Sequence, residues 1–124
     1  MTQRPLSGLS IVIVEDDYYQ AQDCRLILEE AGAQVVSVSA KLPDLDRLLA
    51  EGRVDLMLID INLGHGLSID FARNLKARGI RFAFLTGYDA EMLPDDLAGS
   101  PYLSKPVDGA RIVAALADLG GGAL

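Results

Sequence analysis

Short apolar runs alternate with longer amphipathic segments along most of the chain. The runs are rich in valine, isoleucine and leucine, a composition and length typical of strands buried on both faces of a parallel sheet. They cover residues 9–14, 34–39, 54–59, 81–86 and 101–104. The pattern therefore predicts five strands, joined by segments long enough to hold helices.

Helical spacing, with apolar residues every three or four positions, recurs in the segments between and after these runs. A first helix is expected over residues 17–31, with Gly32 placed to end it. A second is expected to begin at Pro43, because proline fits the first turn of a helix, and to stop at Gly52. Two more are expected over residues 67–78 and 107–119. The positions expected on their buried faces are Ala21, Cys24, Leu28, Ala31, Leu45, Leu48, Leu49, Ile69, Ala72, Leu75, Ile112, Val113 and Leu116.

The fourth connection, residues 87–100, departs from this regular pattern. Pro94 lies in its middle and Gly99 near its end. A proline in a helix interior costs about 3 kcal/mol, so we expect only a short or irregular helix here. The whole order is strand–helix repeated five times, with a weak fourth helix. This order predicts an α/β fold with a doubly wound parallel sheet covered on both faces.

Length and charge narrow the class of protein. The 124 residues fit a single domain, with a core over about 8–119 and a flexible tail at 120–124. The net charge is −7, and no cluster of lysine and arginine is present, so nucleic acid and anionic membrane surfaces are not expected partners. Cys24 is the only cysteine and excludes an internal disulfide. With no signal peptide in residues 1–7 and no apolar stretch of about 20 residues, we expect a cytoplasmic protein.

Acidic residues directly follow two of the predicted strands. Glu15 and Asp16 come after the first strand, and Asp60 comes after the third. In the flavodoxin-like strand order 2-1-3-4-5, these two strands flank the point where the order reverses, and ligands bind there at the carboxyl ends. Carboxylates that lie close together repel one another unless a cation neutralises them. The cluster therefore suggests Mg²⁺ and a phosphoryl group, with Lys105, after the fifth strand, as the lone positive charge.

Together these strand ends resemble the receiver domains of response regulators in bacterial two-component signalling, over nearly the whole chain. The elements that match are the acidic pair Glu15–Asp16, Asp60, Thr86 with the small Gly87, and Lys105 with Pro106. The resemblance implies a flavodoxin-like (βα)5 fold and a signalling switch that catalyses only its own phosphorylation and dephosphorylation. It also implies a histidine kinase or histidine phosphotransfer protein as phosphate donor, and a downstream protein as the partner that responds.

The resemblance gives each residue of the site a task. Asp60 would be the nucleophile that forms an acyl phosphate. Mg²⁺ would be held by Asp16, Asp60 and the backbone carbonyl of Asn62, with Glu15 acting through bound water. Lys105 would pair with Asp60 and then with a phosphoryl oxygen.

Further tasks concern the response to phosphate. The Thr86 hydroxyl would donate to the phosphoryl group, and Tyr102 would turn inward as the switch. The Lys105–Pro106 bond would be cis, as is common in the family. Asn62 and Tyr88 would influence how fast water removes the phosphoryl group.

The run Phe84–Tyr88, followed by Leu93 and Pro94, resembles the FAT GUY group of response regulators. Leu85 stands where that group has alanine. Members of this group are typically stand-alone receivers with an unusual fourth helix, which agrees with the expectation for residues 87–100.

Other interpretations stay open for single residues and for the whole chain. Asp16 could cap the first helix, and Asp17 is expected to do only that. The chain could be a scaffold that signals without phosphate, or the receiver part of a hybrid kinase. A flavodoxin is disfavoured because residues 15–17 would repel a phosphate, and a haloacid-dehalogenase-type phosphatase would have aspartate in place of Asn62. His65 is expected to be an exposed loop residue.

Overall fold

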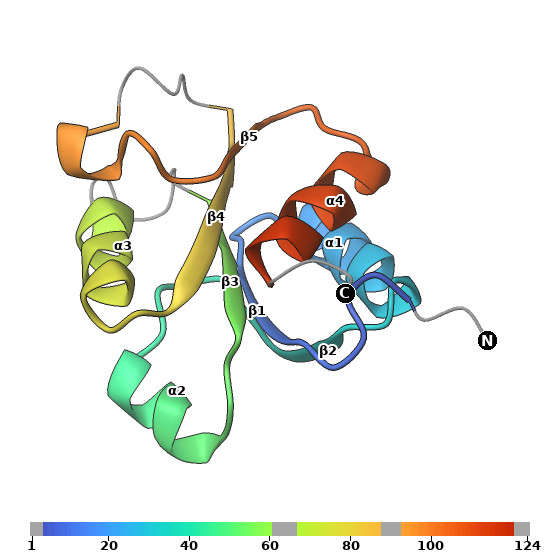
Figure 1. Cartoon of the computed structure of the whole chain (residues 1–124), viewed down its shortest axis with the longest axis horizontal. Coiled ribbons are helices and arrows are strands. Elements are labelled where there is room, and N and C mark those ends of the chain that lie inside the picture. The colour runs from blue at the N-terminus through green and yellow to red at the C-terminus, as the bar shows by residue number, and fades with distance from the viewer. Residues whose placement is uncertain (1–3, 61–66, 88–92, 121–124) are drawn as a thin grey trace.

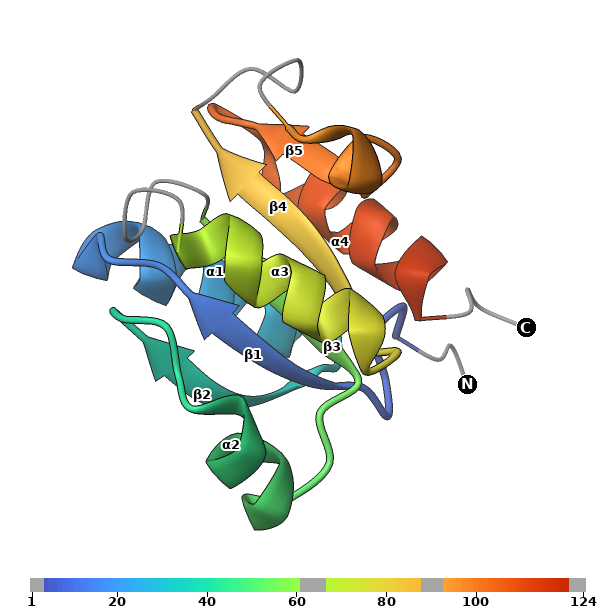
Figure 2. The same cartoon turned by 90° about the vertical axis from the view of Figure 1, so that its left-hand side faces the viewer.

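A computed structural model describes residues 4–60, 67–87 and 93–120 of the chain. Five strands form one parallel sheet in the order β2-β1-β3-β4-β5, so the predicted fold class and strand order are confirmed. The strands are β1 (Ser10–Val14), β2 (Gln34–Ser39), β3 (Leu56–Ile59), β4 (Arg81–Thr86) and β5 (Tyr102–Ser104). The arrows of β1, β2 and β4 point the same way in Figure 2, so their carboxyl ends lie at one edge of the sheet.

Helices cover both faces of the sheet, as the alternating pattern predicted. Helices α1 and α4 lie on one face, and α2 and α3 lie on the other (Figure 1). Their bounds are α1 (Tyr18–Glu30), α2 (Leu45–Glu51), α3 (Leu67–Ala77) and α4 (Gly109–Leu119). In the part of the chain that the structure describes, no helix is both long enough and apolar enough to cross a membrane.

Aspartate side chains fix the starts of three helices by accepting a hydrogen bond from a backbone N–H of the first turn. The capping residues are Asp17 for α1, Asp44 for α2 and Asp108 for α4. The predicted capping role of Asp17 is thereby confirmed. The prediction that the second helix begins at Pro43 was wrong: Asp44 is extended and caps the helix, so α2 begins two residues later than predicted, at Leu45.

The irregular fourth connection is confirmed where the structure describes it. A single 3₁₀ turn, η2 (Asp95–Leu97), stands in place of a full helix, and Pro94 directly precedes it. Leu93 and Leu97 bury their side chains beneath this turn. Residues 88–92 lie outside the described part of the chain.

The core consists of two apolar clusters, one on each face of the sheet. The first includes Ile11 and Ile13 of β1 and Leu28 of α1, together with residues of α4. The second includes Val12 and Val14 of β1, together with residues of α3 and η2. Because β1 is central, its successive side chains enter opposite clusters, and all its positions are buried. The tail expected to be loose falls, apart from Gly120, outside the described residues.

Candidate functional site

The register of the sheet brings the predicted acidic residues to one place. Val14 of β1 lies beside Ile59 of β3, so the residues that follow them leave the sheet side by side. The ladder continues past the strands, because the Asp60 N–H donates to the Val14 carbonyl at 3.0 Å. The Glu15 N–H likewise donates to the Ser39 carbonyl of β2 at 2.9 Å. The backbone under the acidic cluster is therefore fixed by the sheet itself.

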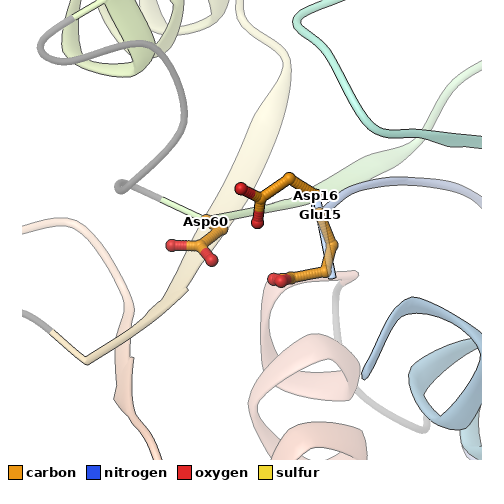
Figure 3. Close-up of side chains that lie close together, drawn as sticks. All are labelled: Glu15, Asp16 and Asp60. Atoms are coloured by element: carbon orange, nitrogen blue, oxygen red, sulfur yellow. The ribbon is translucent and has the colours of Figure 1, made fainter. Parts of the chain in front are cut away.

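The carboxyl groups of Glu15, Asp16 and Asp60 converge at this edge (Figure 3). One carboxylate oxygen from each lies within 4.8 Å of the others. Glu15 and Asp60 are buried, at 5% and 3% exposed, whereas Asp16 is exposed. Oxygen ligands from a few carboxylates, with one side open to water, suit Mg²⁺, which prefers six oxygens and keeps several waters. The residues present therefore fit the ion that the sequence suggested.

Lys105 binds the two buried carboxyl groups of the acidic cluster. Its ammonium group donates to Glu15 Oε2 and to Asp60 Oδ2, both at 3.1 Å. Its backbone N–H donates to the Thr86 carbonyl at 2.8 Å, which ties the residue to the end of β4. The Lys105–Pro106 peptide bond is cis, as the resemblance implied. The resemblance implied that Lys105 pairs with Asp60, and the structure shows this contact together with a second one to Glu15.

Burial and crowding shift the acid–base properties of the cluster. The pKa of Glu15 is raised from 4.5 to about 7, first by burial and then by a hydrogen bond with Asp60 and repulsion from its charge. Burial alone would lower the pKa of Lys105, but its hydrogen bonds to Asp60 and Glu15 outweigh burial and raise it. A proton on Glu15 thus relieves the excess negative charge near neutral pH, and a bound cation would do the same.

Thr86 and Tyr102, the two residues expected to act as the switch, lie on the neighbouring strands β4 and β5. Thr86 ends β4 and is fully buried. Tyr102 of β5 is half-buried and lies in register with Phe84, two residues before Thr86. Tyr102 packs against the cluster of apolar residues that also holds Phe84. The predicted residues Asn62, His65 and Tyr88 lie outside the described part of the chain.

Two supporting contacts were not predicted from the sequence. The Ser68 hydroxyl, buried in the first turn of α3, donates to the Asp60 backbone carbonyl at 3.3 Å. The Asp17 N–H donates to Glu15 Oε1 at 3.2 Å and so orients that carboxyl group. Nothing in the sequence sets Ser68 apart from other serines near a helix start, so only the fold reveals its position.

Solved structures with the same architecture include several response regulators. The solution structure of SdrG from Sphingomonas melonis Fr1 shares 29% identity, with a TM-score of 0.73 over 96% of this chain and 98% of that one. The response regulatory domain of MrkE from Klebsiella pneumoniae shares 21% identity, with a TM-score of 0.75 over 91% of this chain and 96% of that one. A response regulator from Thermotoga maritima shares 18% identity, with a TM-score of 0.78 over 94% of this chain and all (100%) of that one.

The comparison with curated proteins gave no match. The sequence model of the response regulator receiver domain, however, matches residues 11–117, which include the acidic cluster, Thr86 and Lys105. This match covers most of the chain, and the strand order and the positions of the acidic residues agree with it. The chain belongs to the response regulator receiver domain family.

Proposed function

We propose that this receiver accepts a phosphoryl group on Asp60, in a reaction that depends on Mg²⁺. The donor would be the phosphohistidine of a histidine kinase or of a histidine phosphotransfer protein in the cytoplasm. The observation that carries this proposal is the arrangement of charges. Lys105 lies 3.1 Å from a buried aspartate, while Asp16 offers an exposed carboxylate on the side open to water.

The chemistry follows from this arrangement. An Asp60 carboxylate oxygen attacks phosphorus, the O–P bond forms as the N–P bond breaks, and the donor imidazole takes the bonding electrons. Bound Mg²⁺, held by Asp16, Asp60, the Asn62 carbonyl and Glu15 through water, would neutralise the charge of the transferring group. Lys105 exchanges its ion pair with Asp60 for one with a phosphoryl oxygen. The Thr86 hydroxyl then donates to the same group.

The response would be read through the face formed by Thr86 and Tyr102. Thr86 moves toward the phosphoryl group, which leaves space for Tyr102 to turn inward and changes the surface that a partner protein meets. We also assign the chain to the FAT GUY group. The sequence from Phe84 to Gly87 supports this assignment, and so does the single 3₁₀ turn η2.

Nuclear magnetic resonance with Mg²⁺ and beryllofluoride, a mimic of the phosphoryl group, tests the proposal. Amide signals near Asp60, Thr86 and Lys105 should shift when both reagents are present, and Asp60→Asn should abolish the shifts. Asp44→Asn is the matched control, because Asp44 is an exposed helix cap and asparagine caps equally well. No shift in the unmodified chain would refute the proposal. Full activity of Asp60→Asn in cells would favour the scaffold that signals without phosphate.

A further inference from the structure

Two basic residues of α3 hold the 3₁₀ turn η2 against the helix. Arg73 donates to both carboxylate oxygens of Asp96, from Nε at 2.9 Å and from Nη2 at 3.3 Å. Lys76 donates to the backbone carbonyl of the same aspartate at 2.6 Å. The remaining Arg73 nitrogen binds Asp70 at 3.1 Å, one turn away on α3, which keeps the guanidinium group aimed at η2. We call Arg73, Lys76 and Asp96 the α3–η2 clasp.

An isolated ion pair on a surface contributes little, but the clasp differs from one in three respects. The contact of Arg73 with Asp96 uses two parallel hydrogen bonds, the strongest geometry for this pair of groups. It joins residues that are 23 positions apart, so it closes a contact between separate elements. The pKa of Asp96 is lowered by the hydrogen bond from Arg73, and that of Arg73 is raised by Asp96, as expected for a formed pair.

The turn that the clasp holds has little stability of its own. It has three residues, which is too short for a helix to persist without tertiary contacts. Apolar packing supplies the other contact, because Leu97 is fully buried and Leu93 is nearly so. The orange turn lies beside α3 in Figure 1, on the face of the sheet that α2 and α3 cover. The position of η2 therefore depends on two leucines and on the clasp.

The same leucines connect η2 to the expected switch. Leu93 and Leu97 belong to the apolar cluster that contains Phe84, and Tyr102 packs against this cluster. Phe84 and Tyr102 are also paired in register on β4 and β5. Because a core of this density cannot deform continuously, a rotation of Tyr102 has to be matched by a shift of the residues packed around it.

We propose that Arg73 is a positioning residue, which through Asp96 keeps η2 seated on α3 and so favours the arrangement in which Tyr102 packs on the apolar cluster with its hydroxyl buried. This inference rests on the proposed function, because it assigns the clasp a part in the response to phosphate. In the proposed switch phosphate turns Tyr102 inward, so loosening the clasp raises the free energy of the arrangement that phosphate favours. A mimic of the phosphoryl group, which binds this inward arrangement, then binds less tightly.

The test compares Arg73→Met, Arg73→Lys and Asp96→Asn with the unmodified chain. Arg47→Met is the matched control, because Arg47 is exposed and pairs with Glu51 within α2 at 3.3 Å. The first measurement is amide hydrogen exchange of Leu97 and Ser100, whose N–H groups are bonded within the turn. We expect about threefold to tenfold faster exchange in Arg73→Met and Asp96→Asn. Arg73→Lys should have an intermediate effect, because lysine keeps the positive charge but cannot make two parallel hydrogen bonds to the carboxylate. The control should exchange like the unmodified chain.

The second measurement is the affinity for beryllofluoride at saturating Mg²⁺, by nuclear magnetic resonance titration. Arg73→Met and Asp96→Asn should each bind about threefold to tenfold less tightly, and the double variant should bind no less tightly than either single one. Unchanged affinity in variants of a chain that does respond would overturn the clasp's part in switching. No response in the unmodified chain would instead refute the proposed function, while the exchange data would still show whether the clasp holds η2. Unchanged exchange at Leu97 and Ser100 would overturn the clasp itself.

Discussion

Replacing Glu15 with glutamine should stabilise the chain above neutral pH, although it removes one of the two ion pairs of Lys105. Glu15 is buried beside Asp60, and both effects favour its protonated form. Glutamine has nearly the shape of the protonated side chain and carries no charge at any pH. The substitution therefore keeps the packing and removes the repulsion between the two carboxylates.

The magnitude follows from the pKa values in the two states. The pKa of Glu15 rises from 4.5 in the unfolded chain to about 7 in the folded one, so ionising it costs at most about 3 kcal/mol more when the chain is folded. Between these two values the folded state binds more protons. The contribution to stability is therefore fully present below pH 4.5 and is lost as the pH rises through about 7. Glu15→Gln should recover up to about 3 kcal/mol at pH 8 and little at pH 4.

Urea unfolding at pH 4 and pH 8, in the presence of a chelator, measures this difference. The unmodified chain should lose stability from this group between the two values, and Glu15→Gln should lose less by the amount given above. Glu30→Gln is the control, because Glu30 is exposed at the end of α1 and its replacement removes the same charge. Added Mg²⁺ should raise the free energy of unfolding of the unmodified chain by more than that of Glu15→Gln. A Glu15→Gln variant that is no more stable at pH 8, or that keeps the pH dependence of the unmodified chain, would refute the reasoning.

Two further substitutions separate the site from the core. Lys105→Met leaves Glu15 and Asp60 without the cation that binds both, so the free energy of unfolding at pH 8 should fall by about 2 kcal/mol and by less at pH 4. An equal loss at both pH values would contradict this electrostatic account. Leu28→Ala leaves a cavity at a fully buried position of α1. It should lower the free energy of unfolding by about 2–5 kcal/mol, measured by urea unfolding. Under conditions in which Leu28→Ala is still folded, the variant should still respond to Mg²⁺ and beryllofluoride. A folded variant that does not respond would show that this core position affects the site.

Local patterns and the meeting of residues at the carboxyl edge of the sheet could be predicted from the sequence, whereas the exact start of a helix and the side-chain contacts that support the site and the fourth connection could not. Buried parallel strands read as continuous apolar runs, so β1 and β3 were predicted, and with them the shared edge of Glu15 and Asp60. The start of α2 was misplaced because Pro43 fits a first turn, whereas the Asp44 side chain decides where the helix begins. Both residues allow a start nearby, and only the capping hydrogen bond separates the two possibilities.

The fourth connection and the surroundings of Asp60 show the same division. Pro94 predicted that no regular helix would form, but it could not predict that Leu97 anchors the turn or that Arg73 holds it. The contacts of Arg73 and Lys76 with Asp96 join positions 23 and 20 residues apart and depend on the packing of α3. The hydrogen bond from Ser68 to the Asp60 carbonyl spans only eight residues, but it too depends on where α3 packs.

The acidic site destabilises the folded chain, and the two faces of the sheet differ in how much apolar packing they supply to offset this. Burying Glu15 and Asp60 beside a single lysine leaves excess negative charge, and that cost has to be offset by apolar packing elsewhere. The face under α1 and α4 supplies such packing with regular helices at both positions. On the opposite face, the described part of the fourth connection forms a three-residue turn, and Tyr102 packs on that side. Local movement is therefore least costly on this second face, where the α3–η2 clasp and two buried leucines hold η2 in place.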